Sequence, residues 1–74
     1  MNLRQASQTL TDIIDQQVGN PITYGELMKQ AKPIDDQLGF EAVASLFEQL
    51  LNKGEIIQVI KNKDLGIYGY LLPY

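Results

Sequence analysis

The chain has 74 residues, a formal net charge of −3 at pH 7, 45% hydrophobic residues, and neither cysteine nor histidine. This length corresponds to one domain, residues 1–74, and the composition is that of a folded globular protein rather than a disordered one. Without cysteine and histidine, disulfides, thiolate metal sites and histidine general bases are excluded.

Apolar stretches in the sequence are short. None approaches the roughly 20 residues that a membrane-spanning helix needs, and the first residues lack the apolar run of a signal peptide. We therefore expect a cytoplasmic protein that does not contact a membrane.

The first predicted element is a helix from Leu3 to Val18. Its apolar residues recur mostly every third or fourth position, which places them on one face of a helix. Asn2 is a suitable N-cap, and Gly19 follows the last apolar position as a C-terminal glycine does. Pro21 cannot continue the helix, because it lacks a backbone N–H.

A short second helix is predicted from Tyr24 to about Ala31. Thr23 and Glu26 have the spacing of a capping box, in which each side chain bonds the backbone N–H of the other residue. The pair Lys32–Pro33 is expected to end this helix. Residues 33–39 are then predicted to form a turn.

The last predicted elements are a third helix and a β-hairpin. The helix runs from about Phe40 to Asn52 on a clear apolar stripe, and Gly54 is its expected stop. Two short runs rich in β-branched and aromatic residues, 55–60 and 67–72, are typical of strands. The polar segment 61–66 between them suits a hairpin loop.

This order of elements resembles the winged helix-turn-helix superfamily over almost the whole chain. The similarity is carried by Ile22–Leu27, which begins the second helix, and by Leu50–Ile57, which leads from the third helix through a glycine into the first strand. The resemblance implies an α+β fold, a winged helix with three helices followed by a C-terminal β-hairpin wing. Residues 23–27 are also similar to the start of the DNA-binding helices of alkylguanine methyltransferases, but the absence of cysteine excludes methyl transfer.

The resemblance implies a DNA-binding or transcription-regulatory protein whose third helix enters the major groove and whose wing contacts phosphates. On the third helix, Glu41 and Glu48 would repel phosphates, and the negative net charge also argues against tight binding. The residues expected to contact nucleic acid are Tyr24, Ser45, Gln49, Lys53, Lys61, Asn62 and Lys63.

The alternative is a winged-helix module that binds a protein partner or a second copy of itself, without DNA. Tyr68 and Tyr70 alternate along the second strand and so share one face, where exposed tyrosines would suit a protein interface. The same rings also suit the edge of a small core. The sequence leaves DNA binding and protein binding both open.

Nothing in the sequence indicates an enzyme. The acidic pairs Asp12/Asp15 and Asp35/Asp36 lie in polar segments and are interpreted as surface charges or helix caps. Neither a glycine-rich phosphate loop nor a nucleophile motif is present. We therefore expect no catalytic residue, no metal, no cofactor and no small-molecule substrate.

Overall fold

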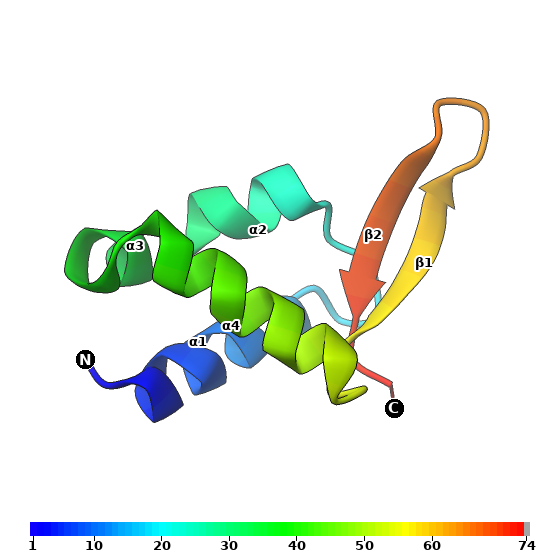
Figure 1. Ribbon diagram of the computed structural model, residues 1–74. Helices are drawn as coiled ribbons and strands as arrows, with labels where there is room; N and C mark the ends of the chain where they lie inside the picture. The colour runs from blue at the N-terminus through cyan, green and yellow to red at the C-terminus, as the bar shows by residue number, and fades with distance from the viewer. Residues whose placement is uncertain (74) are drawn as a thin grey trace.

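The computed structural model describes residues 1–73, in which four helices precede one antiparallel β-hairpin (Figure 1). The elements are, in chain order, α1 (Leu3–Asp15), α2 (Tyr24–Gln30), α3 (Lys32–Leu38), α4 (Phe40–Asn52), β1 (Ile57–Asn62) and β2 (Ile67–Leu71). The fold is mixed α+β, and its layout is consistent with a winged helix. None of these helices is both long and apolar enough to cross a membrane.

The predicted turn at residues 33–39 is wrong, because this segment forms α3. Pro33 was expected to end α2, but it lies in the first turn of the next helix, where its missing N–H costs no hydrogen bond. Ile34 is completely buried and anchors α3 to the core. Gly39, with φ 89°, then separates α3 from α4. The expected three helices are therefore four.

The first helix begins as predicted but ends earlier. Asn2 Oδ1 accepts a hydrogen bond of 2.8 Å from the backbone N–H of Gln5, and Gln5 Oε1 accepts one of 3.0 Å from the backbone N–H of Asn2. The helix stops at Asp15 instead of Val18. Val18 has a positive φ of 54° and is 87% exposed. The prediction that it belongs to the apolar face of the first helix is therefore wrong.

The N-terminus of α2 and the C-terminus of α4 follow their predicted caps. The Thr23 hydroxyl accepts the Glu26 backbone N–H at 3.3 Å, whereas the Glu26 carboxylate accepts a bond from Gln30 instead of completing the capping box. Beyond α4, Gly54 has φ 74°, and the next N–H, of Glu55, bonds to the carbonyl of Leu50 at 2.9 Å. This is a Schellman ending, which turns the chain toward β1.

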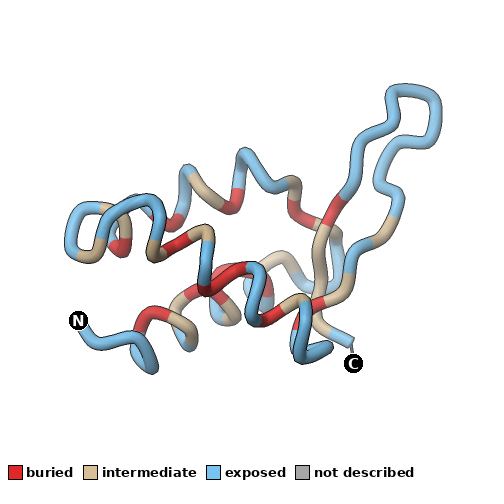
Figure 2. The backbone as a smooth tube through the Cα atoms, in the orientation of Figure 1, coloured by how far each residue is buried: buried red, intermediate tan, exposed pale blue. Residues whose placement is uncertain are grey.

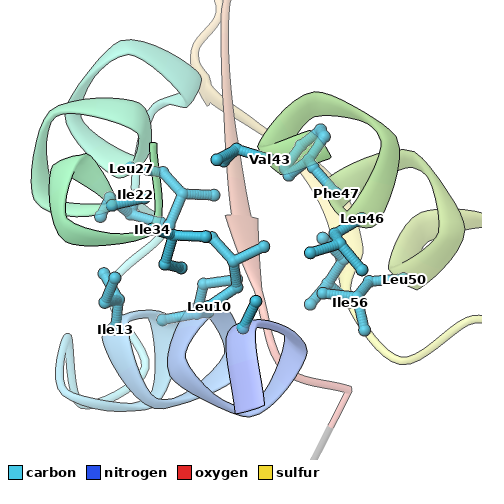
Figure 3. Close-up of a cluster of buried hydrophobic side chains, with 13 residues drawn as sticks. Leu10, Ile13, Ile22, Leu27, Ile34, Val43, Leu46, Phe47, Leu50 and Ile56 are labelled. Atoms are coloured by element: carbon cyan, nitrogen blue, oxygen red, sulfur yellow. The ribbon is translucent and has the colours of Figure 1, made fainter. Parts of the chain in front are cut away.

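The core lies among α1, α2, α3 and α4 and reaches the base of the hairpin (Figure 3). The outer part of the hairpin extends beyond it and is exposed, as Figure 2 shows. The buried residues that form the core are Ala6, Leu10, Ile13, Ile14, Ile22, Leu27, Ala31, Ile34, Val43, Leu46, Phe47, Leu50 and Ile56.

The hairpin strands differ slightly from the expected ranges. β1 begins at Ile57, not at residue 55, and continues to Asn62, into the segment that was predicted as loop. The pairing is regular from Ile57, opposite Leu71, to Ile60, opposite Tyr68, and shifts before Asn62. One additional residue in β1 at this shift lets the strand continue toward the tip.

Candidate functional site

A cleft of about 690 Å³ lies between the start of α2, the outward face of α4 and the hairpin. Three of the residues predicted to contact nucleic acid, Tyr24, Ser45 and Gln49, line this cleft. The complete lining is Tyr24, Ala44, Ser45, Phe47, Glu48, Gln49, Leu51, Asn52, Gln58 and Tyr70.

Three aromatic rings form one side of the cleft. Phe47 is buried and meets Tyr24 edge to face, with ring centroids 5.1 Å apart, and meets Tyr70 in the same manner at 4.8 Å. Such pairs stabilise each other beyond the area they bury. The rings are therefore held in place by the core, while Tyr24 remains partly exposed to the cleft.

The polar side of the cleft is acidic and rich in amides. Glu48 is exposed and lines it together with the side chains of Gln49, Asn52 and Gln58. In the part of the chain that the structure describes, neither lysine nor arginine contributes to the lining. The cleft thus offers hydrogen-bond acceptors and one negative charge, with no cation to meet a phosphate.

The hairpin continues the wall of this cleft toward its tip. In the β1–β2 register Gln58 lies opposite Tyr70, and Ile60 lies opposite Tyr68. Because side chains alternate between the two faces of a strand, these four residues share one face of the hairpin. Tyr70 packs against the core on this face, while Ile60 and Tyr68 are 61% and 50% exposed.

Tyr68 and Tyr70 were both predicted as protein contacts, and the structure separates their environments. Tyr70 lies over the helices and is only partly accessible, whereas Tyr68 lies two residues nearer the tip and is exposed. The exposure of Ile60 was missed from the sequence, since a β-branched residue in a short strand usually signals burial. The alternation that pairs it with Tyr68 was the available signal.

The loop between α1 and α2 fastens the hairpin to the helices. Ile22 and Tyr70 exchange two backbone hydrogen bonds, of 3.0 and 2.8 Å. The side chain of Pro21 lies directly against the backbone of Gly69, so close that a Cβ built there would be 2.4 Å from the Pro21 Cβ. The Lys61 ammonium also donates to the Pro21 carbonyl oxygen at 2.7 Å.

The wing residues predicted to contact phosphates are partly engaged within the chain. Lys61 bonds to the α1–α2 loop, and Asn62 Oδ1 accepts the backbone N–H of Leu65 at 3.1 Å, which shapes the hairpin turn. Lys63 is exposed at the tip. Lys53 lies beyond the end of α4, at the hairpin base, and the six residues of β1 separate the base from the tip by about 20 Å.

Elsewhere, Lys32 forms an exposed ion pair with Asp36 at 2.9 Å, one turn apart on α3. The hydrogen bond that the Lys32 ammonium donates to the Asp36 carboxylate, and the negative charge of that carboxylate, raise the pKa of Lys32 above its ordinary value. None of the basic residues among residues 1–73 lines the cleft.

Metal ligation has no evident site in the described residues, where no group of three or more acidic side chains is placed to hold an ion. Comparison with models of protein families finds no match, and comparisons with curated proteins and with solved structures find none either.

Proposed function

We propose that the chain is a winged-helix module that binds another protein through the concave surface between α4 and the hairpin. This α4–hairpin surface consists of the cleft and of Ile60 and Tyr68, which continue its wall toward the hairpin tip. The observation that carries the proposal is the exposure of this apolar pair on the face that overlooks the cleft.

Burial of these two side chains would favour association. Covering apolar surface contributes about 25 cal/mol per Å², and a fully buried isoleucine contributes roughly 1.5–3 kcal/mol. Tyrosine is enriched at protein interfaces, since it offers apolar area and a hydroxyl. A surface with Ile60 and Tyr68 beside amide groups has the mixed character of such an interface.

The charges favour protein over DNA. Affinity for DNA depends mainly on cations that neutralise phosphates. Here Glu48 occupies the cleft, Lys61 is bonded to Pro21, and Lys53 and Lys63 lie at opposite ends of the hairpin. This distribution gives no continuous positive strip along α4 and the wing.

Peptide selection with a matched pair of variants tests the proposal. Peptides would be selected from a random library on the immobilised protein and then titrated against Ile60→Ser and Ile67→Ser. Ile67 is the control, because it lies on the opposite face of the same hairpin and is also exposed.

We expect Ile60→Ser to weaken the selected peptides about tenfold, the equivalent of roughly 1.4 kcal/mol, and Ile67→Ser to leave them unchanged. Melting curves of both variants would check that each is folded. Equal affinity for the wild type and Ile60→Ser would remove the α4–hairpin surface from the function.

A second candidate function is DNA binding, which the positions of Ser45 and Gln49 favour. Both side chains are exposed on the outward face of α4 beside the hairpin, where a groove-reading helix presents its polar residues. In that case the double variant Lys61→Ala, Lys63→Ala would weaken duplex binding across all sequences.

A further inference from the structure

We infer that the cleft between α2, α4 and the hairpin holds an arginine side chain of the partner protein. The inference rests on the proposed function, which it makes more specific. Two features occur together in the cleft, a partly exposed aromatic wall and the carboxylate of Glu48, and among residues 1–73 no lysine or arginine lines the cleft beside it.

The aromatic wall can stack against the flat face of a guanidinium group. Tyr24 and Tyr70 both meet the buried Phe47 edge to face, so both rings are already packed in the protein without a ligand. A guanidinium placed over a ring face is attracted by the ring quadrupole, and it gains most when it is partly removed from water. Rings that are already ordered lose little conformational entropy on binding.

The acceptors around the wall suit a guanidinium better than an ammonium. Glu48 supplies a carboxylate, and the side chains of Ser45, Gln49, Asn52 and Gln58 supply neutral oxygens. A guanidinium carries five N–H donors in a rigid planar fork, which meets several acceptors while its plane stacks on a ring. An ammonium is a compact and strongly hydrated charge, which can pair with the carboxylate but has no plane to stack on a ring.

The net charge of −3 acts in the same direction at longer range. It attracts a basic segment before contact and accelerates association. An arginine in the cleft would place its neighbouring residues along the hairpin wall, where Ile60 and Tyr68 are exposed. The expected partner is therefore a basic segment that also carries an apolar residue.

NMR titration of the isotopically labelled full chain tests the inference with defined small ligands. The probes are Nα-acetyl-arginine amide and its neutral isostere Nα-acetyl-citrulline amide. We expect the arginine probe to shift saturably the amide resonances of Ser45, Gln49 and Asn52, and the citrulline probe to shift them much less. Resonances of α1 should stay unchanged with both.

Two glutamates on α4 supply the matched variants. Glu48→Gln should raise the Kd of the arginine probe about three- to fivefold, the effect of one exposed ion pair. Glu41→Gln should leave it unchanged, because Glu41 is exposed on the same helix but does not line the cleft. Higher salt should reduce the difference between wild type and Glu48→Gln.

Equal shifts with arginine and citrulline, or equal effects of the two glutamate variants, would overturn the inference. Either result would leave the proposed function standing if Ile60→Ser still weakens the selected peptides, since Ile60 lies outside the cleft. Selected peptides that lack arginine and still shift the cleft resonances would also contradict it.

Discussion

The ammonium of Lys61 donates a 2.7 Å hydrogen bond to the carbonyl oxygen of Pro21, forty residues away in the chain. This bond joins the outer part of β1 to the loop between α1 and α2. The backbone bonds between Ile22 and Tyr70 join the same loop to β2, so the loop contacts both strands of the hairpin.

Removing the Lys61 bond is expected to loosen the hairpin. Lys61→Met keeps the aliphatic chain but loses an exposed charged bond, which is worth about 0.5–1 kcal/mol. Backbone amides of β1 and β2 should therefore exchange with solvent about two- to fivefold faster. Hydrogen exchange measures this, with Lys63→Met, at the exposed tip, as the control. Equal exchange in both variants would show that the bond does not hold the hairpin.

Any side chain at position 69 is expected to destabilise the fold. An added Cβ would lie 2.4 Å from the Pro21 Cβ and 3.3 Å from the Pro21 backbone carbon, and a proline ring has little freedom to move away. Gly69→Ala should therefore lower the free energy of unfolding by about 1–3 kcal/mol.

The control for Gly69 is Gly25, which lies in α2 with open space where a Cβ would be. Gly25→Ala should raise the free energy of unfolding by up to about 1 kcal/mol, because alanine favours the helix. Urea denaturation compares the two variants. Destabilisation of similar size by both would exclude the contact with Pro21 as the cause.

The packing of α3 can be tested at Ile34, which is completely buried. Ile34→Ala should lower the free energy of unfolding by about 2–4 kcal/mol, through lost burial and the cavity that remains. Gln37→Ala, on the exposed side of the same helix, should change it by less than about 0.5 kcal/mol. Thermal or urea unfolding distinguishes this helix from a surface turn, in which neither substitution would matter.

The valine at position 18 is expected to lower the free energy of unfolding, compared with a residue that adopts a positive φ more readily. A β-branched residue at φ 54° is strained, and at 87% exposure it gains almost nothing from burial. Val18→Asn should therefore raise the free energy of unfolding by about 1 kcal/mol, since asparagine adopts this conformation more readily. A melting temperature unchanged or lower in Val18→Asn would mean that the side chain contributes a contact that outweighs the strain.

The sequence predicted the helices and strands wherever a local pattern was strong. Asn2, Thr23 and Gly54 act at the ends of helices as their residue types predict. Pro33 was interpreted in the opposite sense, because a proline both ends one helix and begins the next, and only the burial of Ile34 decides between these roles. The early end of α1 at Asp15 was not predicted, because the apolar spacing continues to Val18.

The candidate site was predictable only in part. Ser45 and Gln49 of the third helix were predicted as contact residues, and both line the cleft, whereas Glu41, which was also singled out on this helix, does not. Their relation to Tyr24 and Gln58 depends on tertiary packing. The role of Lys61 was not predictable, because its partner is a backbone carbonyl distant in sequence.

If the α4–hairpin surface binds protein and not DNA, the chain should not bind labelled mixed-sequence duplex DNA when the two are titrated by fluorescence anisotropy at low salt. Low salt is the condition that most favours phosphate contacts. We predict no saturable binding at protein concentrations that saturate the selected peptides. Saturable binding that weakens steeply with salt, and whose salt slope falls by about one in Lys63→Ala, would contradict the claim.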